Sequence, residues 1–369
     1  MDDYNLNKFA AVMKIKTVLI TGGMGFIGSN FILQARRQNW ANIINLDKIT
    51  DTCNLHTLDQ LAHDSGYVLI KGNIGDRPLV NSLLDKYEPD AVINFAAESH
   101  VDRSILNPTN FIQTNIVGIF ELLEACKEYW QKLSSEKRSR FRFLQVSTDE
   151  VYGSLRAGDL AFTETSSFKP NSPYAASKAS ANHLVRSYYH TYGFPTLTTN
   201  CTNNYGARQF PEKLIPLMII KALQGKHLPI YGDGLHFRDW LYVEDHCTAI
   251  YLDWAGGEVG NTYNIGGNNQ ITNLEVVTKI CEILDKLAPV NFQVNIPINS
   301  KYADLILFIK DRLGHDRRYA INCSKIKRDL GWEPKECFDS GLLKTVQWYL
   351  ANSIWVEQVQ TGAYQTWIQ

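Results

Sequence analysis

The chain carries almost no net charge. Its 37 Lys and Arg residues nearly balance 38 Asp and Glu residues, which leaves a formal charge of −1 at pH 7. A neutral balance gives no electrostatic basis for binding nucleic acid or an anionic membrane surface. The basic run from Lys137 to Arg140 contains no aromatic residue, and we interpret it as a solvated loop. We therefore expect neither of these partners.

Long apolar runs are also missing. The longest, at residues 214–220 and 305–309, are far shorter than the roughly 20 apolar residues of a membrane-spanning helix. The sequence opens with Met1-Asp2-Asp3 and has no basic segment followed by an apolar one, so we expect no signal peptide. We interpret residues 1–13 as a flexible N-terminal extension.

Cysteine is sparse and irregularly spaced. None of the seven cysteines forms a C-x-x-C pair, and an odd number cannot all be bridged. The nine histidines show no ligand spacing with them. This pattern favours free thiols in a reducing cytoplasm and argues against a disulfide framework or a metal site. Internal repeats and low-complexity linkers are missing too, so we expect one large core or two interwoven ones.

The N-terminal part of the sequence does contain a nucleotide-binding pattern. A predicted strand at residues 17–20 is followed by glycines 22, 25 and 28 and then by a predicted helix through Ala35. This spacing allows a tight turn, close approach of the backbone to a pyrophosphate and close helix packing. A second predicted strand ends at Asp47, whose carboxylate can accept from an adenosine ribose and repel a 2′-phosphate. The pattern predicts NAD rather than NADP; turn glycines with a helix-capping Asp are the alternative.

A second pattern carries candidate chemistry. The apolar stretch 141–146 predicts a buried parallel strand, which ends in a hydroxyl and two carboxyls at Thr148, Asp149 and Glu150. Two adjacent acids beside a low-dielectric pocket push their pKa values apart, so that one is protonated while the other is ionised. We interpret the two acids as an acid/base pair; a solvated strand end is the alternative.

The third pattern is Tyr174 and Lys178, four residues apart in a predicted helix, so that both side chains leave the same face. An ammonium beside a phenol lowers the pKa of the phenol, and a tyrosine can then act as a base near neutral pH. We interpret Thr148, Tyr174 and Lys178 as a hydride-transfer apparatus, separate from the acid pair.

The order of the elements predicts the fold class. Strand and helix patterns alternate up to Asn200 and become irregular after it. This alternation is typical of an α/β fold with a Rossmann-like, doubly wound parallel sheet, in which ligands bind beyond the carboxyl ends of the strands. The later segments predict a smaller, mixed α/β substrate-binding lobe. Further predicted elements are strands at 68–70, 91–95 and 305–309, and helices at 115–130, 175–192 and 273–287.

Taken together, residues 14–369 resemble the nucleotide-sugar branch of the extended short-chain dehydrogenase/reductases, and within it the nucleotide-glucose 4,6-dehydratases. The glycine loop and the Tyr174/Lys178 pair fit the whole superfamily. The run Thr148-Asp149-Glu150 is more specific, because the related 4-epimerases and decarboxylases lack this carboxyl pair. The most specific matching segments are residues 96–104, 147–153, 200–216, 231–245 and 314–319.

The resemblance implies a complete reaction on dTDP-glucose. Tyr174 removes the proton of the C4 hydroxyl, whose oxygen Thr148 holds, and NAD accepts the hydride. The C4 ketone acidifies the C5 hydrogen, which Glu150 abstracts while Asp149 protonates the departing C6 hydroxyl. The hydride then returns to C6, which gives a nucleotide 4-keto-6-deoxyhexose and water. We expect a cytoplasmic homodimer, because the helices at 115–130 and 175–192 are apolar on more than one face; a covering layer within the chain is the alternative.

The resemblance also implies a division of the chain and two sets of binding residues. Residues 14–200, with a return segment at about 239–265, are expected to bind NAD, and residues 201–238 and 266–369 the nucleotide sugar. The expected cofactor-binding residues are Gly22, Gly25, Phe26, Ile27, Gly28, Asp47, Lys48, Asn73, Ile74, Phe95, Ala96, Ala97, Ser99, Thr114, Tyr174, Lys178 and Asn204. The expected substrate-binding residues are Ser99, Thr148, Asn203, Lys213, Leu214, Pro229, Tyr231, Arg238, Asn273, Arg312 and His315.

Three positions depart from the family pattern. Asp51-Thr52-Cys53 replaces Tyr-Ala-Gly, Asn73 replaces an aspartate at the adenine contact, and Leu313 replaces a proline. These departures concern nucleotide choice and affinity more than the reaction. The alternatives that stay open are the same reaction on UDP-glucose, a nucleotide-sugar 4-epimerase or decarboxylase, and a catalytically silent NAD-binding regulator.

Overall fold

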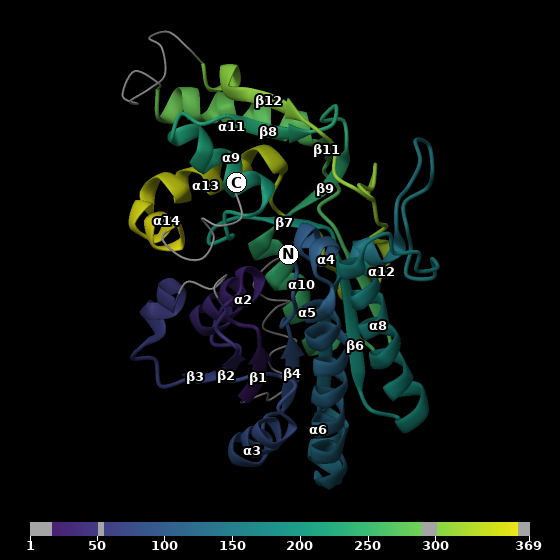
Figure 1. Cartoon of the computed structure of the whole chain (residues 1–369). Coiled ribbons are helices and arrows are strands. Elements are labelled where there is room, and N and C mark those ends of the chain that lie inside the picture. Colours follow the sequence, from purple (N-terminus) through teal and green to yellow (C-terminus); the bar gives the residue numbers. More distant parts are fainter. Residues whose placement is uncertain (1–16, 51–54, 290–300, 361–369) are drawn as a thin grey trace.

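Seven parallel strands form the main sheet of the computed structural model, which describes residues 17–50, 55–289 and 301–360. The strand order is β10-β6-β5-β4-β1-β2-β3, and helices cover both faces of the sheet (Figure 1). The predicted fold class, a Rossmann-like doubly wound α/β sheet, is confirmed. The strands are β1 (Thr17–Thr21), β2 (Asn42–Asp47), β3 (Tyr67–Lys71), β4 (Ala91–Asn94), β5 (Arg142–Thr148), β6 (Thr196–Cys201) and β10 (Thr262–Ile265).

Alternate side chains of each strand enter two different cores. Val18 and Ile20 of β1 belong to a cluster with α2 (Phe26–Arg37) and α10 (Val243–Gly256), whereas Leu19 belongs to the cluster on the opposite face. Helices α3 (Arg77–Tyr87), α6 (Ile119–Lys132) and α8 (Pro173–Tyr192) cover that second face. Because both faces of the central strands are buried, apolar side chains occur on both sides of them, and each buried aliphatic side chain contributes about 1.5–3 kcal/mol.

The predicted helix at 175–192 is α8, and local signals set both of its ends. The hydroxyl of Ser172 accepts from the backbone N–H of Ala175, and Pro173 occupies the first helical position, where no N–H is needed. Gly193 ends the helix in the left-handed region, with φ of 66°. These signals place Tyr174 in the first helical turn.

The predicted helix at 115–130 is also present, although its start is irregular. A short helix, α5 (Thr109–Ile112), leads into a π-helical turn at Gln113–Gly118 that continues as α6. The wider turn buries Asn115, whose side chain binds the backbone of Glu98 through an N–H···O bond in each direction, at 2.9 and 3.0 Å. Such turns occur often at functional sites.

The later segments form the smaller lobe around a third core, as expected. Its three-stranded sheet has the order β11-β9-β7, and β8 pairs in parallel with β12. The predicted helix at 273–287 is α11, which begins at a capping box of Thr272 and Glu275. The lobe contains β7 (Asn203–Tyr205), β8 (Leu228–Tyr231), β9 (Phe237–Tyr242), β11 (Gln270–Thr272), β12 (Ile306–Ile309), α9 (Leu214–Leu223), α11 (Asn273–Leu287), α13 (Phe338–Ala351) and α14 (Ser353–Gln360).

Long-range hydrogen bonds join the two lobes. Trp355 of α14 donates through its indole N–H to the hydroxyl of Thr57, at 3.2 Å. The carboxylate of Asp245, in α10, accepts from the backbone N–H groups of Lys335 and Glu336, at 3.0 and 2.8 Å. None of the helices within the described residues is long and apolar enough to cross a membrane. The expected extension at 1–13 and the Asp51–Cys53 departure lie outside the described residues.

The remaining elements connect these parts. Strand β6 and helix α10 were not predicted individually, because the strand is rich in threonine and the helix is buried on nearly all sides. Short helices follow several strands or precede the last helices; they are η1 (Leu55–Leu61), α4 (Val101–Leu106), α7 (Ser135–Arg140), η3 (Asp149–Tyr152), η5 (Tyr302–Leu305) and α12 (Ser324–Leu330).

Candidate active site

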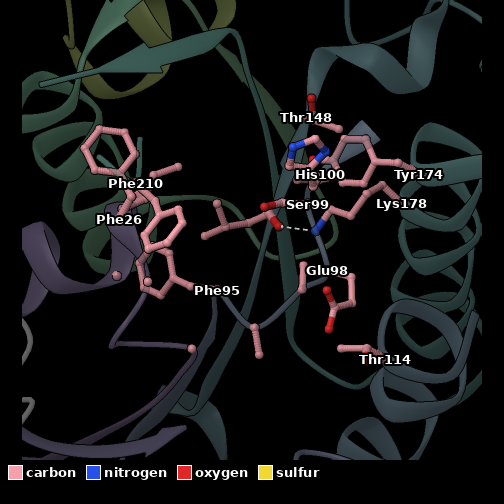
Figure 2. A pocket seen from close by; sticks show the side chains of 18 of the residues that line it. Phe26, Phe95, Glu98, Ser99, His100, Thr114, Thr148, Tyr174, Lys178 and Phe210 are labelled. Carbon is pink, nitrogen blue, oxygen red and sulfur yellow. Dashed lines mark hydrogen bonds between the residues drawn. The ribbon is translucent and has the colours of Figure 1, made fainter. Parts of the chain in front are cut away.

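A cavity of about 330 Å³ lies beyond the carboxyl ends of β1, β2, β4, β5 and β6. The sheet order reverses between β1 and β4, and doubly wound sheets bind nucleotides at such a point. All of the expected cofactor-binding residues line this cavity, together with the five expected catalytic residues. Figure 2 shows Thr148, Tyr174 and Lys178 gathered at one end of the cavity and the rings of Phe26, Phe95 and Phe210 at the other.

The glycine loop packs closely against neighbouring backbone at the start of α2. Gly22 has φ of 71°, and a Cβ there would lie 2.5 Å from the backbone nitrogen of Ala96. A Cβ on Gly28 would lie 2.5 Å from the carbonyl oxygen of Gly22. Helix α2 begins after Gly25 with no side-chain cap and no acid in its first turn, so its N–H groups and dipole can hold a phosphate. These features fit a dinucleotide.

Asp47 ties β2 to the glycine loop. Its carboxylate accepts from the backbone N–H groups of Met24 and Ile49, at 2.9 and 2.7 Å. Burial raises the pKa of Asp47, and these two hydrogen bonds oppose that rise. Asn73, at the expected adenine contact, accepts from the N–H of Gly75 at 2.9 Å through its amide oxygen. Its oxygen therefore already has one donor before any adenine amine reaches it.

The hydride-transfer residues are buried, but Lys178 does not act on Tyr174 in the way the sequence suggested. The ammonium of Lys178 donates to the carbonyl oxygen of Val146 at 2.9 Å, and burial lowers the pKa of Lys178 to about 8. Burial, with smaller contributions that include Glu150, raises the pKa of Tyr174 well above its ordinary value, and the hydroxyl of Thr148 acts against this rise. The expectation of a lowered phenol pKa is therefore wrong here, because desolvation outweighs the nearby cation.

The acid pair occupies the turn η3 directly after β5. The hydroxyl of Thr148 accepts from the N–H of Glu150 at 3.2 Å and lies 3.4 Å from the carboxylate of Asp149. Burial raises the pKa of Asp149 well above its ordinary value, and Glu150 raises it further. Burial also raises the pKa of Glu150, but Lys213, Arg312 and Arg238 act against this. The environment therefore favours the protonated form more strongly at Asp149 than at Glu150.

The expected substrate-binding residues fall into two groups. Ser99, Thr148, Asn203 and Lys213 line the cavity, and the ammonium of Lys213 donates to the carbonyl oxygen of Ser99 at 2.9 Å. The side-chain amide oxygen of Asn203 is buried and has no hydrogen-bond partner among the described residues. The remaining residues do not line the cavity and belong to the smaller lobe; they are Leu214, Pro229, Tyr231, Arg238, Asn273, Arg312 and His315.

Two arginines of this second group are held by neighbouring side chains. Arg238 is buried, donates to the carbonyl oxygen of Asp316 at 2.9 Å, and lies over the ring of Tyr319 at 4.5 Å. Arg312 pairs with Asp102 at 3.4 Å, and Asp102 belongs to α4, the short helix after β4. Both guanidinium groups also act on Glu150 and thus lie toward the acid pair.

His315 belongs to a compact cluster with His236 and Asp311, in which one ligand atom from each residue lies within 4.8 Å of the others. The two imidazole rings stack with centroids 3.7 Å apart, and Asp311 lies 2.6 Å from the Nδ1 of His315. Arg238 and Arg312 lower the pKa of His315, after the larger effect of burial. Two guanidinium charges disfavour a cation at this cluster, so hydrogen bonding and ring stacking account for it.

Sequence reasoning missed several charged residues at the cavity. Glu212 lies 3.3 Å from Arg103 and 3.8 Å from His100, so this carboxylate links the N-terminal end of α4 to the segment before α9. Glu98, Gln209 and Phe210 also line the cavity. Residues 96–104 carry three charges next to a strand end, and this signal in the sequence indicates a site.

Comparisons with known proteins agree with this geometry. The family model of GDP-mannose 4,6 dehydratase matches residues 19–345. A dTDP-glucose 4,6-dehydratase of Xanthomonas campestris is 54% identical over 350 residues, which cover 95% of this chain and 97% of the relative. The enzyme of that name from Neisseria meningitidis is 53% identical over 95% of this chain and 98% of the relative.

Solved structures show the same relationship. The dTDP-glucose 4,6-dehydratase of Bacillus anthracis, crystallised in complex with NAD, has a TM-score of 0.80 and 43% identity over 93% of this chain and 99% of that chain. The NAD in that crystal agrees with the cofactor predicted from the sequence. The glycine loop, the switch-point cavity, the Tyr174/Lys178 helix and the acid pair thus occur together in a chain that belongs to the GDP-mannose 4,6-dehydratase family of extended short-chain dehydrogenase/reductases, and within it to the dTDP-glucose 4,6-dehydratases.

Proposed function

We propose that this chain converts dTDP-glucose into dTDP-4-keto-6-deoxyglucose and water, with NAD as a cofactor that is regenerated in each turnover. The observation that carries this proposal is the Asp149–Glu150 pair at one end of the cavity, next to Thr148, Tyr174 and Lys178. A dehydrogenase or an epimerase of the same fold has no use for a protonated acid beside an ionised one. When bound, NAD takes up a hydride from sugar C4 and returns it to C6.

The hydride-transfer residues act on the C4 hydroxyl. Thr148 holds its oxygen, and Tyr174 accepts its proton. Lys178 carries its charge at neutral pH, because its pKa is about 8, and it lies one helical turn from Tyr174. This charge acts against the rise in pKa that burial gives Tyr174, and it stabilises the phenolate as that form arises during proton transfer.

The acid pair performs the elimination once C4 is a ketone. Glu150 is the residue kept more ionised, by Lys213, Arg312 and Arg238, and it removes the C5 proton. Asp149 is the residue kept protonated, and its proton goes to the C6 hydroxyl, which leaves as water. One bond to hydrogen breaks at C5 and one C–O bond breaks at C6, so the step needs no external oxidant. The same two residues can return a proton to C5.

The residues that bind NAD and the diphosphate of the nucleotide sugar are assigned from the chemical groups that each ligand needs. Solved relatives include a dTDP-glucose 4,6-dehydratase of Streptomyces venezuelae with NAD and dTDP bound, at a TM-score of 0.82 and 38% identity over 93% of this chain and 99% of that chain. In this chain the expected cofactor-binding residues hold NAD, and Lys213, Arg238 and Arg312 supply the cations that a diphosphate needs. Residues 14–200 with about 239–265 form the NAD-binding part, and residues 201–238 with 266–369 the nucleotide-sugar part.

A paired-substrate assay tests this function. Purified protein is incubated with dTDP-glucose and, in parallel, with UDP-glucose, and the product mass is measured. Loss of 18 mass units from dTDP-glucose, about the mass of one water, supports the proposal; an unchanged sugar mass points to an epimerase and contradicts it. The double variant Asp149→Asn with Glu150→Gln is expected to keep substrate-dependent NADH absorbance but to form no dehydrated product, a loss of at least about 100-fold.

We also propose that the chain acts as a cytoplasmic homodimer. Of the apolar side chains that suggested a partner, Ile119, Leu123 and Val185 are buried within the chain, so the covering layer within the chain accounts for them. Phe120 is 40% exposed, however, and Val117 is equally exposed on the same helical stretch. This remaining apolar surface supports a second copy as its partner.

A further inference from the structure

A chain of four buried polar side chains joins the helix of the hydride-transfer residues to the turn of the acid pair. Asn182 donates to the amide oxygen of Asn200, and Asn200 donates to the hydroxyl of Tyr152, both at 2.9 Å. Tyr152 donates in turn to the amide oxygen of Asn264, also at 2.9 Å. The exposed fraction of each of these four side chains is 5% or less.

The chain crosses four separate elements. Asn182 lies in α8, just over two turns beyond Tyr174; Asn200 lies in β6 and Asn264 in β10. Tyr152 is the last residue of η3, whose first two residues are the acid pair. All the hydrogen bonds run in one direction, and such chains strengthen one another in a low-dielectric interior. The amide of Asn264 continues to the carbonyl oxygen of Phe162 at 3.3 Å.

The hydroxyl of Tyr152 stays a donor and an acceptor at working pH, because burial raises its pKa. Its ring is separately held: it stacks on Phe162 with centroids 5.1 Å apart and meets Phe168 edge-on at 5.3 Å. The ring therefore stabilises the core, whereas the hydroxyl is what links η3 to β6 and β10. A Tyr152→Phe variant separates these two contributions.

The two ends of the chain differ in how many other contacts hold them. Helix α8 has further anchors near Tyr174. The backbone N–H of Tyr174 donates to the hydroxyl of Ser104 at 3.2 Å, and the side-chain amide of Asn115 donates to the hydroxyl of Ser177 at 2.9 Å. The turn η3 is four residues long, and besides Tyr152 it is held by the Thr148 cap and by two backbone bonds. Loss of the chain should therefore displace the acid pair more than α8.

We propose that Tyr152 is a positioning residue for the elimination step, and that the Asn182–Asn200–Tyr152–Asn264 chain sets the place of Asp149 and Glu150 relative to Tyr174. The inference rests on the proposed function. Neither Tyr152 nor the three asparagines need touch the sugar, since they act through the turn that carries the acids. Small displacements of an acid or base from its target proton are costly for catalysis, about a hundredfold for 1 Å.

The test compares two partial reactions in Tyr152→Phe and wild-type protein, both loaded with NAD. Single-turnover mixing with dTDP-glucose gives the rate of C4 oxidation from NADH absorbance, and product mass with deuterium uptake at C5 in heavy water gives the rate of elimination. The expected result is an elimination rate lowered by about tenfold, with the oxidation rate changed by less than about twofold. A purely structural role would slow both together.

The matched control is Tyr302→Phe. Tyr302 is also fully buried, and its hydroxyl donates to the carbonyl oxygen of Ala288 at 2.8 Å in the smaller lobe. This control is expected to leave the ratio of the two rates unchanged. If Tyr152→Phe does not retain NAD, Asn182→Ala cuts the same chain from the α8 side with a residue of high helix propensity, and the same change of ratio is expected.

The outcomes separate the inference from the function on which it rests. An unchanged ratio in Tyr152→Phe, or an equal loss of both rates, overturns the positioning role while active wild-type protein keeps the proposed function. Wild-type protein that forms no dehydrated product overturns the proposed function and the inference with it.

Discussion

Replacement of Lys178 by Met should make the protein more stable and inactive. Lys178 is 4% exposed, and burial lowers its pKa from 10.5 to about 8. At 1.36 kcal/mol for each pKa unit, keeping the charged form in the folded protein at pH 7 costs about 3 kcal/mol. The variant removes this cost and keeps most of the apolar side-chain volume.

The variant also loses a hydrogen bond, which reduces the gain. The ammonium donates to the carbonyl oxygen of Val146 at 2.9 Å, and the loss of such a bond costs about 1 kcal/mol. The expected net effect is a free energy of unfolding raised by about 2 kcal/mol at pH 7. Turnover should fall at least about 100-fold, because Tyr174 loses the neighbouring cation that favours its phenolate.

The pH dependence of this difference has a definite sign. Between about pH 8 and pH 10.5, Lys178 is neutral in the folded protein but still charged in the unfolded chain. The unfolded state then binds more protons, so wild-type stability rises with pH relative to the variant. Above about pH 10.5 only the lost hydrogen bond remains, and the variant should be the less stable protein by about 1 kcal/mol.

Urea unfolding of nucleotide-free protein at pH 7, 9 and 10.5 measures this difference, since effects of other titrating groups cancel between the two proteins. Lys132→Met, at an exposed lysine of α6, is the control and should change stability by less than about 0.5 kcal/mol. A Lys178→Met variant that is less stable than wild type at pH 7 would refute the assignment of Lys178 as a destabilising buried charge.

Three further outcomes are expected. Gly22→Ala places a Cβ 2.5 Å from the backbone nitrogen of Ala96, at a φ of 71°. The variant should purify with less than about a tenth of the wild-type NAD content, as measured by absorbance after denaturation. Normal NAD content would contradict the close packing of the loop on the backbone of Ala96. Phe120→Asp should shift the protein toward monomer in analytical ultracentrifugation. The control Phe308→Asp, at a 53% exposed ring on β12, should not. A dimer that survives Phe120→Asp uses another surface. Burial lowers the pKa of His246 to about 3, so below about pH 6.5 the unfolded chain takes up a proton that the folded chain does not. The free energy of unfolding should therefore fall from pH 6 to 4 more steeply in wild type than in His246→Leu. Equal slopes in urea unfolding would argue against a buried neutral His246.

The local patterns of the sequence were enough to predict the nucleotide-binding half. Strand β1, the glycines, helix α2 and Asp47 lie within about 30 residues, and each signal depends only on near neighbours. The pair Tyr174 and Lys178 was likewise predictable, since it needs only the 3.6-residue period of a helix. Helix α11 was predicted with its observed limits because its cap and its apolar period agree.

What could not be predicted depends on contacts between distant segments. Lys213, Arg238 and Arg312 lie 63 to 162 positions after Glu150 in the sequence, yet all three act on its carboxyl. The direction of the Lys178 ammonium toward Val146, and the burial that raises the pKa of Tyr174, likewise follow from packing. These cases share one reason: desolvation and long-range charge are properties of the assembled interior.

The sequence by itself thus determined which chemical groups are present and which of them stand close along the chain: a glycine loop, a base with its lysine, and two adjacent acids. The tertiary structure alone decided how these groups are charged and how they face one another. It did so by burying Asp149 deeply and bringing Lys213, Arg238 and Arg312 to act on Glu150, and by linking η3 to α8 through Tyr152 and Asn200. A carboxyl's proton affinity depends on its solvent and its neighbours, which only folding supplies.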